Sequence, residues 1–402
     1  MKYGDRRFTL EKYMTGGVNN VVRDIMKSTF FNAKEREFMT SYARASRQAA
    51  KLRSQAEKEG EHIPPFLIAS ITSSCNLHCA GCYARENDIC NDEVPQNQLS
   101  GAEWRDLFEQ ARDLGVGFIL LAGGEPMIRR DVIEAAGEIP EILFPVFTNG
   151  TMLSDDYIDL FDRKRNLVPI VSIEGHETLT DDRRGAGVYR AVTTGMQKIQ
   201  EKGLIFGDSV TVTTENLEEV TSDDFIRDLE ERGCKAVIFV EFVPVTEDSK
   251  HLAPGDAERA LLRARIKHLK RTFNMVFISF PGDEKTSGGC LAAGRGFFHI
   301  NPHGGAEPCP FSPYSDVNVR DTSLREAMHS KLFQALQDGD ILMEDHDGGC
   351  ILFEKKDQVE ALLQGGDARG ENGDGRSTER ITQTKRKEHP CFRSLLWKMT
   401  KI

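Results

Sequence analysis

The sequence predicts an α/β protein with a parallel sheet, and two observations carry this prediction. Short runs rich in Val, Ile, Leu and Phe alternate with amphipathic segments at helical spacing, as in sheets with right-handed crossovers. Polar and glycine-rich motifs follow these runs directly, and sites in parallel barrels collect at the carboxyl ends of strands. The seven predicted strands are 66–70, 117–122, 143–147, 168–173, 209–213, 236–243 and 275–279.

The segment before the first strand is predicted to be a charged helical extension, residues 1–63. The following Pro64-Pro65 pair cannot continue a helix. We expect this extension to pack on the outside of the main domain through a partial apolar stripe. The stripe consists of Phe30, Phe31, Phe38, Met39, Tyr42 and Ala43.

The clearest helix signal lies between the first two strands. Ser100-Gly101-Ala102-Glu103 has the pattern of a capping box, and Gly115 is a typical residue just past a helix end. The helical spacing between them predicts one buried face. That face consists of Trp104, Leu107, Phe108, Ala111 and Leu114.

Composition limits the class of protein. The chain has 402 residues, enough for two or three domains, and its net charge of -11 argues against a nucleic-acid or anionic-membrane partner. No apolar run approaches the about 18 residues that span a bilayer, and no apolar signal region follows the N-terminus. We therefore expect a cytoplasmic protein. In a reducing compartment its nine cysteines indicate metal ligation, not disulfides.

Three cysteines in one turn after the first strand are the strongest functional signal. Cys75, Cys79 and Cys82 have the spacing C-x3-C-x2-C, and Tyr83 follows directly. Thiolates this close in sequence can converge on one metal centre. Three ligands on a four-iron cubane leave one iron open for substrate or cofactor. A structural zinc knuckle is the alternative, but zinc takes four ligands and no partner pair of cysteines is present.

This motif resembles the signature of the radical S-adenosylmethionine (radical SAM) enzymes, although here the aromatic residue comes after the third cysteine and not before it. The resemblance implies a partial (β/α)6 TIM-like barrel over residues 64–285, with the seventh run leading into the next domain. It further implies a 4Fe-4S cluster on Cys75, Cys79 and Cys82 as the catalytic centre. An electron from a low-potential donor, such as flavodoxin or ferredoxin, would cleave S-adenosylmethionine there to a 5′-deoxyadenosyl radical.

The motifs after the second and third strands resemble the family's cofactor pocket. Gly123-Gly124-Glu125-Pro126 has backbone amides free to bond a ligand, and the Glu125 carboxylate could accept from the S-adenosylmethionine ammonium. Thr148-Asn149-Gly150 supplies a hydroxyl and an amide. Each motif is also an ordinary turn when considered alone. Tyr83 belongs to the same predicted pocket.

Motifs after the fourth and sixth strands complete the predicted cofactor pocket. The resemblance implies that Ser172 and Glu174 meet ribose hydroxyls, with Glu174 standing where many relatives carry Asp. It implies that Arg184 pairs with the cofactor carboxylate. Val243 lies in an apolar segment that would pack near the adenine, although an ordinary buried strand end has the same composition.

A second cysteine region resembles the SPASM/twitch extension of radical SAM enzymes, residues 286–363. Cys290, Cys309 and Cys350 are the expected ligands of one auxiliary iron–sulfur cluster, with Cys391, a non-cysteine group or substrate as fourth ligand. Buried free thiols are the alternative. A hairpin around Pro302-His303-Gly304-Gly305 and a helix over 324–336 are also predicted.

The remaining cysteines and the C-terminal end complete the sequence-based picture. Cys90 and Cys234 have no companions at ligand spacing and are predicted to be structural. Residues 364–402 are predicted to be a disordered tail with a short apolar end that docks or binds a partner.

The resemblance leaves three function classes open. Many relatives with this extension modify peptides, so peptide or protein side-chain modification is the leading expectation. Biosynthesis of a cofactor or another small molecule is the first alternative, because no N-terminal peptide-binding module is evident. A non-catalytic iron–sulfur carrier or sensor is the second, and the Gly123-Gly124-Glu125 cradle argues against it, because a carrier needs no such cradle.

Overall fold

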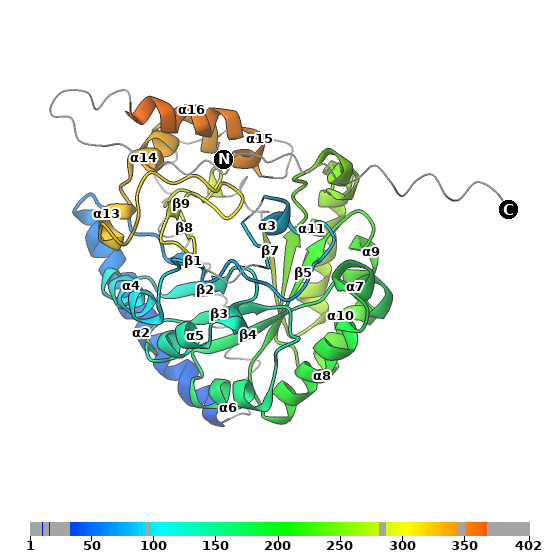
Figure 1. Cartoon of the computed structure of the whole chain (residues 1–402). Helices are drawn as coiled ribbons and strands as arrows, with labels where there is room; N and C mark the ends of the chain where they lie inside the picture. Colours follow the sequence, from blue (N-terminus) through cyan, green and yellow to red (C-terminus); the bar gives the residue numbers. More distant parts are fainter. Residues whose placement is uncertain are drawn as a thin grey trace, which may run out of the picture.

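A single sheet organises the described part of the chain. The computed structural model describes residues 10, 16, 33–87, 89–92, 96–280, 287–343 and 350–367. The strand order is β7-β6-β5-β4-β3-β2-β1-β8-β9, and the sheet is not closed. Figure 1 shows its strands fanning out inside a ring of helices. The strands are β1 (Phe66–Ser70), β2 (Phe118–Ala122), β3 (Phe144–Thr148), β4 (Leu167–Ser172), β5 (Gly207–Val212), β6 (Ala236–Glu241), β7 (Val276–Phe280), β8 (His299–Ile300) and β9 (Ala306–Glu307).

The α/β prediction is confirmed, because β1 to β7 pair in parallel in chain order. The seventh predicted run is β7, which pairs with β6 and so lies within the sheet at its edge. The main covering helices are α4 (Gly101–Leu114), α5 (Arg130–Gly137), α6 (Asp155–Arg163), α8 (Val188–Glu201), α10 (Asp223–Glu231) and α11 (Asp256–Thr272). Shorter helices are α3 (Tyr83–Glu86), η1 (Pro126–Ile128), α7 (Glu177–Arg184), α9 (Leu217–Val220) and η2 (Glu247–Leu252).

Helix α4 begins and ends where local chemistry predicts. The Glu103 N–H donates to Ser100 Oγ at 3.3 Å, and the Ser100 N–H donates to Glu103 Oε2 at 2.7 Å. These reciprocal bonds satisfy two amides of the first turn. Gly115 adopts the left-handed conformation at φ 91° and stops the helix. All five apolar residues predicted to face inward are buried.

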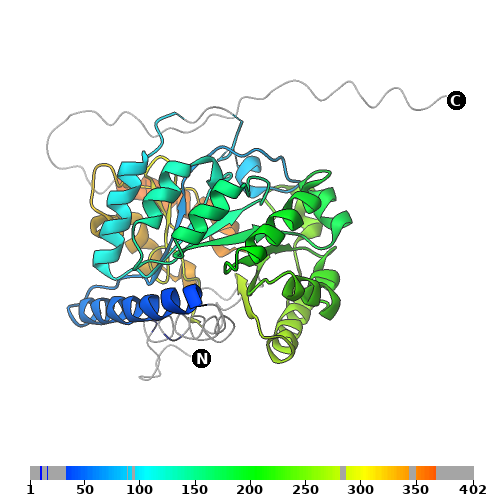
Figure 2. The ribbon, with the colours of Figure 1, turned by 90° about the horizontal axis from the view of Figure 1, so that it is seen from below.

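Helix α2 (Ala33–Lys58) packs across the amino ends of the strands, below the sheet in Figure 2. The Tyr42 hydroxyl donates to the Gly117 carbonyl at 2.9 Å, just before β2. The Ile205 N–H, just before β5, donates to buried Glu35 at 3.2 Å. The predicted helical segment is therefore present over 33–58, and Phe30 and Phe31 lie outside the described residues. Because α2 covers the amino ends, the carboxyl ends remain available for a site.

The C-terminal region joins the same sheet. Strand β8 pairs in parallel with β1, with Ile68 opposite His299, and β9 returns antiparallel to β8. This is the predicted hairpin, and in Figure 1 it lies beside β1. Four helices and a 3-10 turn follow: α13 (Leu324–Ala327), α14 (Lys331–Asp338), η3 (Asp340–Met343), α15 (Ile351–Glu354) and α16 (Lys356–Asp367).

One predicted helix is wrong in detail. Residues 324–336 form α13 and α14 and not one continuous helix. The cause is Ser330, whose Oγ accepts from the Phe333 N–H at 3.1 Å and starts a new helix. The apolar spacing is nearly continuous across the break, so periodicity alone did not reveal it. The predicted tail beyond residue 367, Cys391 included, lies outside the described residues.

Within the described ranges no helix is both long enough and apolar enough to cross a membrane.

Asp208 is an unusual carboxylate in the core of this sheet. It lies near the start of β5, is 0% exposed, and neither of its oxygens has a hydrogen-bond partner among the described residues. The neighbouring buried thiol of Cys234 donates to the Ala236 carbonyl at 3.1 Å. Burial raises the pKa of Asp208 to about 7, and the charge of nearby Arg232 offsets this only in part.

Replacing Asp208 with Asn is therefore expected to stabilise the protein at pH 8 by about 4 kcal/mol, a gain that shrinks toward pH 4. The folded state holds this proton up to about pH 7, whereas the unfolded carboxyl releases it near its ordinary value of 3.8. The free energy of unfolding of the native protein therefore falls as pH rises from 3.8 to about 7. The Asp208→Asn substitution removes this pH dependence. Anaerobic urea unfolding at pH 5 and pH 8 measures it. A variant less stable than the native protein at pH 8 would contradict this account.

Candidate active site

The loop after β1 places the first three cysteines at the carboxyl end of the sheet. Cys75, Cys79 and Cys82 are half-buried and are not in disulfides. The Ala80 N–H donates to the Arg183 carbonyl at 2.8 Å, and Arg183 Nε donates back to the Ala80 carbonyl at 3.2 Å. These two bonds fasten the middle of the loop to α7, so the cysteines are held between β1 and that helix.

Arg85 and Gly81 fix the shape of the same loop. Arg85 donates to the Leu77 carbonyl at 2.9 Å and to the Cys75 carbonyl at 3.1 Å, so two backbone oxygens face one guanidinium. Gly81 has φ 65°, and a Cβ there would lie 2.8 Å from the Phe242 ring. Only glycine suits this position, because the conformation is left-handed and the aromatic ring leaves no space.

The three cysteines supply thiolates, the donors that an iron–sulfur cluster takes. In the described part of the chain no three His, Cys, Asp or Glu side chains are placed to hold one metal ion. A single zinc needs each thiolate at about 2.3 Å, whereas the thiolates of a cubane each bind a different iron. Three cysteines spread along one loop therefore fit the predicted 4Fe-4S cluster by the chemistry of their thiolates.

Gly123 and Gly124 lie directly against the cysteine loop. The Gly124 N–H donates to the Thr72 carbonyl and the Glu125 N–H to the Ser74 carbonyl, both at 2.8 Å. A Cβ on Gly124 would meet the Ser74 carbonyl oxygen at 2.0 Å, and one on Gly123 would meet the Thr72 oxygen at 2.4 Å. The predicted cradle is thus in backbone contact with the loop that carries Cys75.

Glu125 bonds to its own chain in this structure. It is 0% exposed, and its oxygens accept from Met127 N–H at 3.0 Å, Thr148 Oγ1 at 2.8 Å and Asn149 N–H at 2.7 Å. Burial raises its pKa to about 7, although these three donors lower it. The carboxylate therefore joins the ends of β2 and β3. The sequence analysis instead predicted that it accepts a hydrogen bond from the ammonium group of S-adenosylmethionine. Pro126 begins η1 directly after it.

Asn149 extends this hydrogen-bond network to the cysteine loop. Its Nδ2 donates to Asn76 Oδ1 at 2.8 Å and approaches Cys75 Sγ at 4.0 Å. Its Oδ1 accepts from Thr151, which fixes the orientation of the amide. The end of β3 thus holds a hydrogen-bond donor beside a predicted cluster ligand.

Glu174 and Arg184, predicted to contact the cofactor separately, form a buried ion pair. Glu174 is 1% exposed and accepts from Arg184 Nε at 3.0 Å and from the Thr211 N–H at 3.0 Å. Burial lowers the pKa of Arg184, but Glu174 and the nearby Cys79 more than offset this and raise it. The guanidinium therefore lies beside the cysteine loop. The Ser172 hydroxyl is 3.1 Å from that of Ser209, and Val243 is buried beyond β6.

The second group of cysteines also comes together. Cys309 follows β9, Cys350 precedes α15, and their thiols share a hydrogen bond with Cys290 nearby. This bond, burial and the two neighbouring thiols raise the pKa of Cys309 well above its ordinary value. The three positions lie up to 60 residues apart in sequence, so tertiary structure alone assembles them.

Tyr83 lies between the two cysteine groups. Burial raises the pKa of its hydroxyl, and both Cys82 and Cys309 add to that rise, which places the side chain near each group. Its ring packs on Phe311 with the centroids 4.7 Å apart. An aromatic pair therefore occupies the space between the loop after β1 and the turn after β9.

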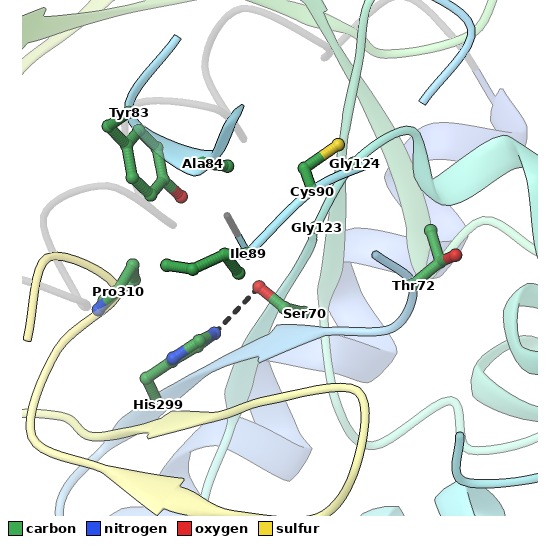
Figure 3. Close-up of a pocket in the computed structure, with 10 residues that line it drawn as sticks. All are labelled: Ser70, Thr72, Tyr83, Ala84, Ile89, Cys90, Gly123, Gly124, His299 and Pro310. Atoms are coloured by element: carbon green, nitrogen blue, oxygen red, sulfur yellow. Dashed lines mark hydrogen bonds between the residues drawn. The ribbon is translucent and has the colours of Figure 1, made fainter. Parts of the chain in front are cut away.

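A small cavity opens where these parts meet (Figure 3). It is small, with about 10 Å³ accessible to the centre of a water molecule, and Gly123, Gly124, Tyr83, Cys90 and His299 are among its lining residues. His299 Nε2 lies 2.7 Å from Ser70 Oγ, the bond dashed in Figure 3.

The His299 ring is held on both sides. Its Nδ1 lies 2.7 Å from Glu307 Oε2, whose other oxygen accepts from Asn301 at 2.6 Å. Neither His299 nor Cys90 was predicted to belong to the site. Both reach it through long-range pairing, His299 through β8 and Cys90 through a bridge next to the cysteine loop, and no local sequence signal marks such pairing.

Comparison with known proteins gives consistent findings. Residues 69–230 match the family model described as the Radical SAM superfamily. The AdoMet-dependent heme synthase of Methanosarcina barkeri is 27% identical over 322 residues, 73% of this chain and 89% of that protein. The GTP 3',8-cyclase of Clostridium perfringens is 25% identical over 324 residues, 72% and 96% of the two chains.

Solved structures share the fold. SuiB of Streptococcus suis, in a crystal structure with S-adenosylmethionine, superposes with a TM-score of 0.63 over 79% of this chain and 81% of SuiB. The two sequences are 17% identical. This likeness concerns the fold alone.

Proposed function

Because the chain belongs to the radical SAM superfamily and is an S-adenosylmethionine-dependent iron–sulfur enzyme, we propose that it acts on a precursor of a small organic cofactor. The observation that carries this proposal is the length of the similarity to named enzymes. A heme synthase and a GTP cyclase each align over more than 70% of this chain and most of their own length. The resemblance to relatives with a SPASM/twitch extension favoured a peptide substrate, whereas the relatives found by comparison support the alternative class.

The proposed role of each residue follows from its position in the site. Cys75, Cys79 and Cys82 would hold the 4Fe-4S cluster. When bound, the cluster and S-adenosylmethionine supply a 5′-deoxyadenosyl radical that abstracts a hydrogen atom from the substrate. Gly123 and Gly124 pack against the loop after β1, where a side chain would collide with the Thr72 and Ser74 carbonyls, and we propose that this turn forms the wall of the site for the methionyl end.

Other residues would orient the cofactor and the substrate. Glu125 holds the end of β3, and with it Thr148 and Asn149, against the cysteine loop. Tyr83 and His299 line the small cavity next to the glycine cradle, and we propose that these side chains lie at the edge of the substrate site. Walls of apolar and hydrogen-bonded side chains would keep water from the reacting carbon.

The remaining residues of the predicted pocket also keep proposed roles. Ser172 ends β4 and Val243 lies just beyond β6, where we propose that the ribose and the adenine of the cofactor are bound. Glu174 and Arg184, paired with each other, would act as one unit beside Cys79.

The C-terminal region fits a SPASM/twitch-like extension. We propose that Cys290, Cys309 and Cys350 hold one auxiliary iron–sulfur cluster, because the fold gathers these thiols on the far side of Tyr83. The domain limits of 64–285 and 286–363 are part of this proposal. As a radical SAM enzyme the protein takes a reductant, and flavodoxin or ferredoxin is the proposed donor.

A substrate panel tests the proposed class. Anaerobically reconstituted protein is given S-adenosylmethionine, dithionite and one of iron–coproporphyrin III, GTP or a cysteine-containing peptide. We expect the porphyrin or the nucleotide to raise 5′-deoxyadenosine formation several-fold above the substrate-free rate, with a new product in mass spectrometry. Cys79→Ala protein is the control and should give no 5′-deoxyadenosine in any arm. Stimulation by the peptide alone would contradict the proposal and restore the peptide class.

A further inference from the structure

A chain of four polar side chains connects the C-terminal hairpin to the end of β1. Asn301 Oδ1 accepts from two backbone amides of the hairpin turn, both at 2.9 Å, and this fixes the orientation of its amide. Asn301 Nδ2 donates to Glu307 Oε1 at 2.6 Å, and Glu307 Oε2 lies 2.7 Å from His299 Nδ1. His299 Nε2 lies 2.7 Å from Ser70 Oγ, the bond dashed in Figure 3. The hairpin backbone therefore orients every member of the chain.

The hydrogen-bond partners assign a direction to this chain. An ionised Glu307 can only accept, so His299 Nδ1 carries a proton and donates it to the carboxylate. In a neutral imidazole the other nitrogen then has no proton, and His299 Nε2 accepts from the Ser70 hydroxyl. His299 is 2% and Glu307 5% exposed, so water competes little for these bonds. The chain thus ends in the Ser70 oxygen, which keeps lone pairs for a further donor.

Ser70 lies on the more open face of the sheet, at the carboxyl end of β1. It pairs with Ala122 of β2, and residues paired across neighbouring strands share a face. Residues of β2 on the Ala122 face are half-buried, whereas the alternate residues Ile119 and Leu121 are at most 1% exposed. Ser70 also lines the small cavity beside Gly124, which has room for about one water-sized group. A polar group of a bound molecule can therefore reach the Ser70 oxygen.

A purely structural role for the chain is the alternative, because it also joins the hairpin to β1. The backbone already makes this junction, since β8 pairs with β1 and the Ile68 N–H donates to the Phe298 carbonyl at 3.0 Å. The side chains add groups that a junction does not need: a hydroxyl, a base bonded to it, and a carboxylate that orients the base. This order of groups is typical of acid–base sites.

We propose that Ser70 and His299 form an acid–base pair that takes a proton from an N–H or O–H group of the substrate. Ser70 Oγ contacts the substrate and is the catalytic residue, while Glu307 is a positioning residue that acts through His299. As the substrate proton moves to Ser70 Oγ, the Ser70 proton moves to His299 Nε2. The substrate keeps the electron pair of its broken bond, and the Glu307 charge stabilises the imidazolium.

This inference deepens the proposed function and rests on it, because it requires a substrate bound against the end of β1. It restricts that substrate to a molecule whose N–H or O–H group loses its proton during the reaction. The protonation state of His299 can be measured without any substrate, so the acid–base pair and the substrate class are tested separately.

The first test is nuclear magnetic resonance of protein with isotopically labelled histidine nitrogens, reconstituted anaerobically and measured at pH 8 without substrate. The His299 signals are those missing from His299→Gln protein. We expect a protonated Nδ1 and an unprotonated Nε2 in the native protein. Glu307→Gln protein should show the reverse, because Asn301 holds the glutamine oxygen and the glutamine amide must donate to Nδ1. A proton on Nε2 of the native protein would overturn the proposal, because that nitrogen could accept no other.

The second test measures turnover of the variants with whichever of the porphyrin, the nucleotide and the peptide stimulates the native enzyme most. We expect Ser70→Ala and Glu307→Gln to form product at least about 100-fold more slowly. Thr221→Val is the matched control, because it removes a buried hydroxyl at the end of α9, and it should keep the native rate.

Circular dichroism and iron content must be native in each variant before the rates are compared. Native turnover by both folded variants would overturn the acid–base role and leave the chain with a structural one. A failure of the proposed substrate class has a different appearance, since the peptide alone would then stimulate the enzyme. If none of the compounds stimulates it, the magnetic resonance result alone decides the acid–base pair.

Discussion

Gly124→Ala protein is expected to lose both stable cluster binding and S-adenosylmethionine cleavage. A Cβ at this position would lie 2.0 Å from the Ser74 carbonyl oxygen, 2.4 Å from the Ser74 carbonyl carbon and 3.0 Å from the Cys75 nitrogen. All three atoms belong to the backbone, so no side-chain rotation relieves the collision. The loop that carries Cys75 must move away from β2, and the geometry of the three thiolates moves with it.

The measurements are iron per chain after anaerobic reconstitution and the rate of 5′-deoxyadenosine formation, and both should fall to background. Gly117→Ala is the matched control, because its new Cβ would make only ordinary contacts at 4.0 Å with Ala49 and Tyr42. That variant should keep native iron and activity. Full cleavage by the Gly124→Ala enzyme would mean that the glycine turn is not part of the cofactor cradle.

Replacing Cys290, Cys309 and Cys350 together with Ala should lower bound iron by about four per chain, the content of one cubane. The hydrogen bond between Cys309 and Cys350, with Cys290 nearby, is the structural reason to treat them as one unit. Substrate-free 5′-deoxyadenosine formation should survive, because Cys75, Cys79 and Cys82 are unchanged. Turnover of the true substrate should fail, because its radical would lose an electron acceptor or an anchor.

The main confounder is unfolding, since an emptied metal site also removes stabilisation. Circular dichroism must be native before the iron result counts. Cys234→Ala is a useful control, because it removes a buried thiol that lies beside Asp208 and not in either cysteine group. Unchanged iron in a folded triple variant would exclude an auxiliary cluster and return these residues to buried free thiols.

Features that depend on neighbours in sequence could be predicted before the structure. The α/β class followed from alternating apolar runs, and the start and end of α4 followed from Ser100, Glu103 and Gly115. The three cysteines after β1 could be identified for the same reason, because eight consecutive residues contain all of them. In each case the physical cause is local: strand periodicity, capping, or several ligands in one turn.

Features that depend on distant partners could not be predicted. Nothing around Cys90 indicates that a bridge between Ser74 and Asn91 brings its segment beside the cysteine loop, and nothing around His299 indicates Ser70 as its partner. Glu125 shows the limit for a single residue, because its sequence context suggests a ligand-facing carboxylate and only the fold turns it toward β3. Side-chain direction is set by tertiary packing, which a motif does not encode.

The pairing of β8 with β1 has a consequence for how the protein is made. Strand β1 is the first strand of the sheet to leave the ribosome, yet its second edge pairs with β8, about 230 residues later. Until then β1 presents unpaired backbone groups on one side, and exposed edges of this kind template association between chains. The C-terminal hairpin therefore closes the open edge of β1 once the chain is complete, as well as lining the cavity, and truncation before residue 299 would leave that edge open.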